Sequence, residues 1–317
     1  MPLSGVVLVT GGTGSFGHTI VRRMLAEPGV ETIRVFSRDE NKQDAMREEH
    51  DNDPRLVMIT GDVRDPESIE SAMRGVRWVF HAAALKQVPN CERFPVEAIR
   101  TNTLGSENVR RAAVKCGPEA VVAISTDKAC APINAMGLSK ALMERIFLRA
   151  PEPGVGTRFV CTRYGNVIGS RGSVVPLFLK RIEQGRPIPI TDGAMTRFML
   201  NLDVAVENAV VAVLNGSHGE MWIKKMPAAT VGDIAAAIRP RDDYPLEHVG
   251  VRPGEKMHEV LINEEEMRRT EDRGEYFVIG SVERTRERDL REYSSFNTER
   301  LDVPGIRHLL ACAKRLS

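Results

Sequence analysis

Short runs of continuous apolar residues alternate with helical periodicity through the first half of the chain. The first run, at residues 6–9, is followed by apolar residues at helical spacing over residues 18–25. Further runs predict strands at residues 32–36, 56–59, 78–80 and 120–124, and helices are predicted between them, for example at residues 69–73 and 107–114. Strands buried on both faces and separated by helices predict an α/β fold with a doubly wound parallel sheet. Ligands of such sheets bind at the carboxyl ends of the strands.

The alternation ends near residue 167. Pro176, Pro187 and Pro189 interrupt the pattern, and the later segments are shorter and more polar. A smaller α/β substrate-binding lobe is therefore expected. Residues 202–214 predict one more helix packed on the sheet, so the two parts are expected to interleave. The predicted division is residues 1–167 with about 200–222 for the large domain, and about 168–199 with 223–317 for the smaller lobe. The alternating charges of residues 284–292 predict a solvated surface segment.

Composition narrows the classes of protein. The 317 residues are 42% hydrophobic and 27% charged, with a formal net charge of +1, which argues against a general binder of nucleic acid. The five cysteines are few and odd in number, so we expect reduced thiols in a cytoplasmic protein. No apolar run approaches the ~20 residues of a membrane span. The seven histidines show no metal-ligand spacing, so no metal site is expected.

A glycine-rich turn joins the first predicted strand to the first helix. Gly11, Gly14 and Gly17 suit a tight turn, a close approach of the backbone to a pyrophosphate, and close contact between helix and sheet. The N-terminus of the helix supplies N–H groups and a positive dipole end for phosphates. This arrangement predicts a Rossmann-type domain that binds a dinucleotide.

The tip of the second strand bears on which dinucleotide binds. NAD is favoured by an acid at this tip, and NADP by cationic or hydroxyl groups. Ser37 stands where the acid would be, followed by Arg38 and, one turn later, Lys42, so NADP is favoured. The alternative is NAD, with Asp39 holding the ribose. After the third and fourth strands, Asp62 with Val63, and the alanines that begin at Ala82, are expected to lie against the cofactor.

The stretch with the most chemistry follows the fifth strand. Ser125, Thr126, Asp127 and Lys128 set two hydroxyls, an acid and an amine side by side. Met136 and Lys140 follow, four residues apart and therefore on one face of a predicted helix. A surface ion pair is the plainer interpretation of Asp127 and Lys128, but their position at the carboxyl end of a strand favours a catalytic one.

Taken together, these residues resemble the extended short-chain dehydrogenase/reductase family. The closer resemblance is to its inverting UDP-N-acetylglucosamine 4,6-dehydratases. It spans essentially the whole chain and rests on residues 10–17, 37–40, 82–89, 125–128, 163–167, 171–173, 195–198 and 252–256.

The resemblance implies a reaction in which NADP⁺ takes hydride from C4 of the sugar and the new ketone acidifies the C5 proton. A base then removes that proton while an acid protonates the leaving C6 hydroxyl, and the hydride returns to C6. Retaining relatives have Asp-Glu here, so Asp127-Lys128 resembles the inverting type, with Asp127 as the acid and Lys128 as the base. Because a free lysine has a pKa near ~10.4, Lys128 is expected to need a lowered pKa, helped by burial and by the cationic Lys140.

The chain departs from most of the superfamily at one catalytic position. Most members have Tyr-x-x-x-Lys, in which the tyrosine accepts the hydroxyl proton. Here Lys140 is kept but Met136 replaces the tyrosine, and a thioether cannot accept that proton. A subset of the inverting dehydratases also has methionine there. The proton must then pass to Lys128, to Thr126 with water, or to a solvent chain, and the sequence leaves these three open.

The resemblance also implies binding residues and partners. Catalytic roles are expected for Thr126, Asp127, Lys128 and Lys140; cofactor contacts for Gly11, Thr13, Gly14, Ser15, Phe16, Gly17, Ser37, Arg38, Lys42, Asp62, Val63, Ala82, Lys86, Ser125, Met136, Lys140, Tyr164 and Val167; and substrate contacts for Lys86, Lys128, Asn166, Ser173, Thr191, Arg197, Arg252 and Glu255. The expected substrate is UDP-N-acetylglucosamine or a close UDP-hexosamine, and the expected assembly is a homo-oligomer, a dimer or a hexamer. Two alternatives stay open: a retaining dehydratase or C4-epimerase, and a non-catalytic NADP-binding regulator.

Overall fold

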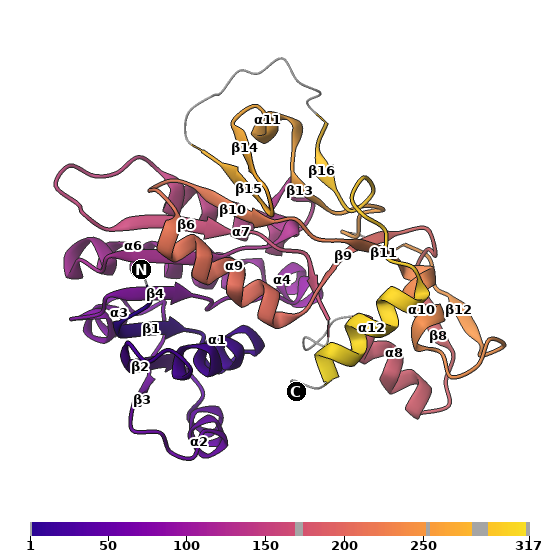
Figure 1. Ribbon diagram of the computed structural model, residues 1–317, viewed down its shortest axis with the longest axis horizontal. Coiled ribbons are helices and arrows are strands. Elements are labelled where there is room, and N and C mark those ends of the chain that lie inside the picture. Colours follow the sequence, from indigo (N-terminus) through magenta and orange to yellow (C-terminus); the bar gives the residue numbers. More distant parts are fainter. Residues whose placement is uncertain (1, 169–173, 252–253, 281–290, 315–317) are drawn as a thin grey trace.

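A nine-stranded sheet organises the molecule (Figure 1). The computed structural model describes residues 2–168, 174–251, 254–280 and 291–314. The strand order is β3-β2-β1-β4-β5-β6-β10-β15-β14. The strands are β1 (Gly5–Thr10), β2 (Val30–Ser37), β3 (Leu56–Thr60), β4 (Trp78–His81), β5 (Ala120–Ile124), β6 (Arg158–Thr162), β10 (Met221–Lys224), β14 (Thr270–Arg273) and β15 (Tyr276–Ile279). The seven strands from β3 to β10 are mutually parallel, and β15 runs antiparallel to both of its neighbours, β10 and β14. The predicted Rossmann-type α/β fold is confirmed.

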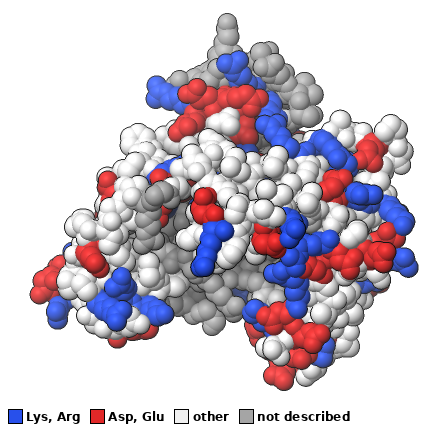
Figure 2. All heavy atoms as spheres, turned by 180° about the vertical axis from the view of Figure 1, so that it is seen from behind, with Lys and Arg blue, Asp and Glu red and all other residues white. Residues whose placement is uncertain are grey.

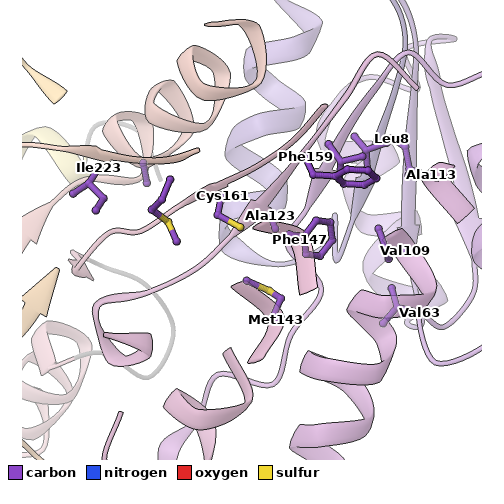
Figure 3. Close-up of a cluster of buried hydrophobic side chains, with 14 of the residues drawn as sticks. Leu8, Val63, Val109, Ala113, Ala123, Met143, Phe147, Phe159, Cys161 and Ile223 are labelled. Carbon is purple, nitrogen blue, oxygen red and sulfur yellow. The ribbon is translucent and has the colours of Figure 1, made fainter. Parts of the chain in front are cut away.

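Helices cover both faces of this sheet. The helices are α1 (Ser15–Leu25), α2 (Glu40–Glu49), α3 (Pro66–Met73), α6 (Gly105–Cys116), α7 (Ala135–Leu148) and α9 (Leu202–Asn215). One core joins α1 and α9 to the sheet, and the other joins α3, α6 and α7 to its opposite face. Figure 3 shows part of the second core, a cluster that includes Val109, Met143 and Phe147 from the helices and Leu8 and Phe159 from the sheet. The predicted helix at residues 202–214 therefore does pack on the large sheet.

The sheet has more strands than the sequence pattern predicts. Strands β6, β10, β14 and β15 follow the five that the apolar runs predict. β14 and β15 come from the region that the prediction assigns to the smaller lobe, and they pair with each other and with β10. The exact division into two lobes remains a prediction.

A separate apolar core lies on the right of Figure 1. It joins α8 (Val174–Glu183), α10 (Val231–Ile238) and α12 (Val303–Lys314) to β8 (Ile188–Ile190), β9 (Thr196–Leu200) and β11 (Ala228–Thr230). β9 also pairs with β7 (Asn166–Val167), and β8 with β12 (Leu246–His248). Because β7 follows directly from β6, this part of the molecule is joined to the large sheet at the carboxyl end of β6.

The remaining elements are short. They are α4 (Val88–Arg93), α5 (Pro95–Ala98), the π-helical η1 (Ile99–Leu104), the 3₁₀ turn η2 (Asp127–Ala129), α11 (Glu264–Met267), β13 (Val260–Ile262) and β16 (Tyr293–Ser294). Of the segment predicted to be solvated, residues 284–292, residues 284–290 lie outside the described residues.

The surface and the helices bear on possible partners. On the face in Figure 2, lysine and arginine side chains are interspersed with aspartate and glutamate, so the described residues of that face form no continuous basic patch. Among the described residues, no helix is both long enough and apolar enough to cross a bilayer.

Candidate functional site

A cleft of about 1080 Å³ opens at the carboxyl ends of β1, β2, β4 and β5. The sequence analysis predicts cofactor contacts from the glycine turn to Val167, and all of those residues line this cleft. Thr126, Lys128, Lys140 and Asn166 line it as well. The structure therefore brings the predicted cofactor and catalytic segments together, although their roles remain predictions.

The glycine turn leaves room for backbone contact only. Gly11 has φ +67°, and a Cβ there would lie 2.7 Å from the Cα of Ala83. A Cβ on Gly17 would lie 1.9 Å from the carbonyl oxygen of Gly12, so the helix packs directly on the turn. α1 begins at Ser15 with no side-chain cap and no acidic residue in its first turn. Its N–H groups and dipole therefore remain available to an anion, so the cleft fits a dinucleotide pyrophosphate.

At the tip of β2, the polar side chains already have partners within the protein. The Oγ of Ser37 accepts a hydrogen bond from Nε2 of Gln43 at 3.0 Å. Asp39 caps α2 by accepting from the N–H of Lys42 at 3.1 Å, and its carboxylate also pairs with the Lys42 ammonium, which lowers the pKa of Asp39. Arg38 lies 3.7 Å from Asp62 across the cleft. The Asp39 carboxylate is thus already satisfied within the chain.

Thr126, Asp127 and Lys128 form one hydrogen-bonded unit at the end of β5. The Thr126 hydroxyl donates to Oδ1 of Asp127 at 2.9 Å, and Nζ of Lys128 donates to the same oxygen at 2.9 Å. Asp127 is fully buried and lies outside the cleft lining, whereas the side chain of Lys128 is 25% exposed. Oδ2 of Asp127 is buried without a hydrogen-bond partner among the described residues.

The expected lowering of the pKa of Lys128 is wrong. Burial lowers the pKa of Lys128, but the charges of Asp127 and Glu259 outweigh burial and raise it to about 12. The Glu259 carboxylate lies 3.6 Å from Nζ. Lys140, the cation expected to help, is not among the charges that act on Lys128. The resting pair is therefore a carboxylate and an ammonium.

The lysine with the lowered pKa is Lys140. Burial reduces its pKa to about 8, although Glu144 acts in the opposite direction. Its Nζ contacts the carbonyl oxygen of Ile124 at 2.6 Å and Sδ of Met143 at 2.9 Å. Neither neighbour carries the negative charge that holds the proton on Lys128.

Met136 is buried, with 4% of its surface exposed. It lies four residues before Lys140 on α7, and both line the cleft. It packs with Cys91 and Ala98 in a small apolar cluster. The position thus faces the cleft, but it presents only carbon and sulfur there.

The predicted substrate residues fall into three groups. Lys86, Lys128 and Asn166 line the cleft, and Oδ1 of Asn166 is buried without a hydrogen-bond partner among the described residues. Thr191, Arg197 and Glu255 lie outside its lining. Ser173 and Arg252 lie outside the described residues.

The sequence analysis missed the acid that faces Lys128. Glu259 precedes β13 and is 4% exposed. Its Oε1 is 3.6 Å from Nζ of Lys128 and 3.9 Å from Nε of Arg197, while its Oε2 is buried with no hydrogen-bond partner in the described chain. The only local signal is an acid placed directly before the apolar run of residues 260–262.

A buried ion network behind the cleft was missed as well. Arg163 makes paired hydrogen bonds to Glu144 at 2.8 and 2.6 Å and to Glu266 at 2.7 and 2.8 Å. Glu144 also accepts from the hydroxyl of Ser125 at 2.5 Å. The network therefore holds α7, the end of β6 and α11 against the strand that carries the catalytic segment.

A buried histidine supports the neighbouring strand. His81 at the end of β4 contacts Oγ1 of Thr10 at 2.7 Å and Oγ of Ser106 at 2.8 Å. Burial, followed by the charge of Lys140, lowers its pKa to about 3. In the described part of the chain, no group of three or more His, Cys, Asp or Glu side chains is placed to hold a metal ion.

Known proteins resemble this chain in sequence and in fold. A protein of Rickettsia rickettsii named UDP-glucose 4-epimerase is 44% identical over 323 residues, which cover 96% of this chain and 94% of its own. The X-ray structure of Pen from Bacillus thuringiensis matches with a TM-score of 0.90 and 34% identity, covering 97% of this chain and 98% of its own. The UDP-glucose 4-epimerase of Thermus thermophilus, in complex with NAD, matches with a TM-score of 0.68 and 25% identity over 79% of this chain and 88% of its own.

These likenesses support the predicted class, the nucleotide-sugar epimerases and dehydratases, and leave the particular reaction open. Residues 7–281 match the family described as "Polysaccharide biosynthesis protein". The match covers most of the sheet, the glycine turn and the segment from Ser125 to Lys140. The chain belongs to this polysaccharide biosynthesis protein family.

Proposed function

We propose that the chain is an NADP-dependent UDP-N-acetylglucosamine 4,6-dehydratase that inverts C5 and yields a UDP-2-acetamido-2,6-dideoxy-4-keto-hexose for glycan synthesis. One observation carries the proposal. A carboxyl group and an amine, Asp127 and Lys128, are hydrogen-bonded at 2.9 Å, and Lys128 lines a cleft that fits a dinucleotide. Loss of water across C5 and C6 needs an acid and a base of this kind held side by side.

The roles follow from the two side chains. When bound, NADP⁺ takes hydride from C4 and returns it to C6. Asp127 holds the proton that goes to the leaving O6, and Lys128 takes the proton from C5, which regains a proton on its opposite face. Thr126 lines the cleft and accepts a hydrogen bond from the C4 hydroxyl, while Lys140 provides charge near the cofactor ribose.

NADP remains the favoured cofactor, with NAD as the alternative. Arg38 and Lys42 line the part of the cleft beside Ser37, and the Asp39 carboxylate is used in capping α2. These groups suit a 2′-phosphate better than a bare ribose. The bound NAD of the Thermus epimerase keeps the alternative open.

The UDP part of the substrate is assigned to groups beyond the cofactor cleft. Lys86 and Asn166 line the cofactor cleft, and Thr191, Arg197 and Glu255 lie outside its lining. Oε2 of Glu255 is buried without a partner among the described residues, as expected of an acceptor for ribose hydroxyls. Ser173 and Arg252 complete the proposed set from outside the described residues.

A C4-epimerase is the second candidate because the Rickettsia relative carries that name. An epimerase moves a proton only at O4, so it has no use for the pair formed by Asp127 and Lys128. Retention at C5 is disfavoured by the same pair, and a regulator that only binds NADP needs neither residue.

One experiment separates these candidates. Purified protein with NADP⁺ and UDP-N-acetylglucosamine, without added reductant, is expected to give a product that has lost one water by mass spectrometry. NMR of C5 then reads the configuration. An isomer of unchanged mass indicates the epimerase, and unchanged substrate with every UDP-hexosamine rejects both enzymes.

We also propose a cytoplasmic homo-oligomer, a dimer or a hexamer. Ile99 and Leu104 on η1 and Leu138 and Leu142 on α7 are large apolar residues with 44–54% of their surface exposed. Hydrogen bonds between the two helices, such as Thr103 Oγ1 to the Ser139 carbonyl at 3.1 Å, hold them together as one surface. A second copy would cover such a patch. Leu142→Glu is expected to lower the mass measured by light scattering, and an unchanged mass would remove this surface as the interface.

A further inference from the structure

The proposed dehydration leaves two protons unaccounted for. Asp127 must carry a proton when O6 leaves, and Lys128 must lack one when C5 is deprotonated. The resting pair has the opposite charges, with the pKa of Lys128 raised to about 12. A source of protons for Asp127 and an outlet for Lys128 are therefore required. The inference below rests on the proposed function.

The Thr126 hydroxyl is placed to supply Asp127. Oγ1 of Thr126 donates its hydrogen to Oδ1 of Asp127 at 2.9 Å, and it accepts from the backbone N–H of Lys128 at 3.4 Å. The remaining lone pair of that oxygen can accept a hydrogen bond from the cleft, which Thr126 lines. Because Asp127 is fully buried, a substrate hydroxyl reaches its carboxylate through Thr126.

The other side chains near the cleft are poorer acceptors. Met136 offers a thioether, which cannot take a proton. Lys140 directs its ammonium to a carbonyl oxygen and a sulfur atom inside the protein and is 5% exposed. Lys128 already holds its proton between two carboxylates.

Glu259 is placed to accept a proton from Lys128. The charged groups that face Nζ are Asp127 from η2, Glu259 from the segment before β13, and Arg197 from β9. When Asp127 gains a proton, Glu259 is the acid that remains, 3.6 Å away. A small side-chain rotation or one bridging water closes this distance to a hydrogen bond. The unpartnered Oε2 of Glu259 leaves that carboxylate able to take a proton.

We propose that Thr126, Asp127, Lys128 and Glu259 form a proton relay that replaces a tyrosine. The C4 O–H bond breaks as Thr126 Oγ1 takes its proton, and the former Thr126 proton passes to Oδ1 of Asp127. C4 is oxidised to the ketone, and the nicotinamide cofactor of the proposed function takes the two electrons with the C4 hydrogen. Lys128 then passes a proton to Glu259 and becomes the amine that deprotonates C5.

The relay closes on itself. Asp127 gives its proton back to Thr126 as the Thr126 hydroxyl protonates the leaving O6, so that water forms, and Lys128 keeps the C5 proton as an ammonium. Because C5 is inverted, solvent supplies the new proton to the opposite face of C5 as C6 is reduced, and Glu259 gives its proton to solvent, which restores the resting ion pair. Oxidation of C4 and readiness to lose O6 are coupled, because Asp127 gains a proton in the first step and gives one up in the second.

Asp127→Asn tests the first half of the relay. An acid that serves only O6 would leave C4 oxidation intact, so the reduced cofactor would accumulate at 340 nm in a single turnover. The relay instead predicts that reduction slows at least about 100-fold, the contribution of a general base. Adding Met136→Tyr, which places a phenol on the cleft face of α7, is expected to restore reduction without water loss. Normal reduction in Asp127→Asn, or failure of the added tyrosine to restore it, overturns the relay.

Glu259→Gln tests the second half. It is expected to reduce the cofactor while water loss slows at least about 10-fold at pH 7 and recovers toward high pH, where Lys128 loses its proton to solvent. Glu259→Asp is expected to restore water loss at pH 7. Glu259→Gln with an unchanged pH profile would exclude Glu259 from the relay.

A binding measurement supplies a readout other than turnover. Calorimetry is expected to show that the wild-type protein prefers UDP-N-acetylglucosamine over its 4-deoxy analogue, and that Thr126→Val reduces this preference by about fivefold, the value of one hydrogen bond. Thr126→Ser is expected to retain it. An equal preference in Thr126→Val overturns the first transfer. If the wild-type protein releases no water from any UDP-hexosamine, the proposed function itself fails, whereas these variants test only the proton route.

Discussion

Replacing Arg163 with methionine is expected to unfold the chain far more readily than replacing an exposed arginine. The Arg163 side chain is 4% exposed and lies between the carboxylates of Glu144 and Glu266, which are 5% and 8% exposed. Its guanidinium makes paired hydrogen bonds to both acids and another to the carbonyl oxygen of Leu261 at 2.9 Å. Methionine has a similar length but satisfies none of these acceptors.

The size of the effect follows from what is left behind. Removing one partner of a buried ion pair costs about 3–5 kcal/mol, because the other charge stays buried and unpaired. Arg163→Met leaves two such charges, so the loss is expected to reach the upper part of that range. At ~2 °C per kcal/mol for a chain of this size, the melting temperature is expected to fall by ~8–10 °C.

Thermal melting followed by circular dichroism, together with urea denaturation, measures the loss. The matched control is Arg100→Met, which breaks a 2.8 Å pair with Glu97 that is 59% and 40% exposed, and which is expected to cost less than about 1 kcal/mol. Combining Arg163→Met with Glu144→Gln and Glu266→Gln is expected to recover much of the loss, since no unpaired charge remains. If Arg163→Met costs no more than Arg100→Met, the network contributes nothing and the reasoning is refuted.

Three further predictions concern pH, the proton route and the cofactor. The pKa of His81 is lowered to about 3, so below pH ~6.5 the unfolded chain binds a proton that the folded chain does not. As the pH drops below that value, stability is therefore expected to fall by roughly 1.4 kcal/mol per pH unit from this residue, and His81→Asn is expected to flatten the curve of unfolding free energy against pH; parallel curves would contradict this. The wild-type protein is expected to turn over its substrate without the Met136→Tyr change. A wild-type protein that is inactive, together with a Met136→Tyr variant that is active, would contradict the proposed site. Arg38→Ala with Lys42→Ala is expected to weaken binding of NADP⁺ at least about tenfold and of NAD⁺ little, measured by fluorescence titration, and equal losses would favour NAD.

The sequence predicted the strands that are buried on both faces and missed those whose place depends on distant partners. The apolar run of β1 is fully buried from Val7 to Val9, as its pattern indicates. β14, Thr270–Arg273, carries no apolar residue and, among the described residues, pairs only with β15 at the sheet edge. β6 begins with Arg158, whose guanidinium finds the carbonyl oxygens of Val213 and Gly216 near the end of α9. Neither partner can be inferred from a local window.

The same division holds within the site, where the sequence predicted which side chains reach the cleft but not which of them hold protons. Position follows from the carboxyl end of β5 for Thr126 and Lys128 and from the face of α7 for Lys140, and all three line the cleft, although their roles remain predictions. Charge state follows from the nearest carboxylates. Lys128 has one as its sequence neighbour and a second, Glu259, that reaches it only because β13 packs against the turn η2. Lys140 faces a carbonyl oxygen and a thioether instead. Two lysines that line the same cleft therefore have pKa values displaced in opposite directions, and the carboxylates around Lys128, not burial, account for much of the difference.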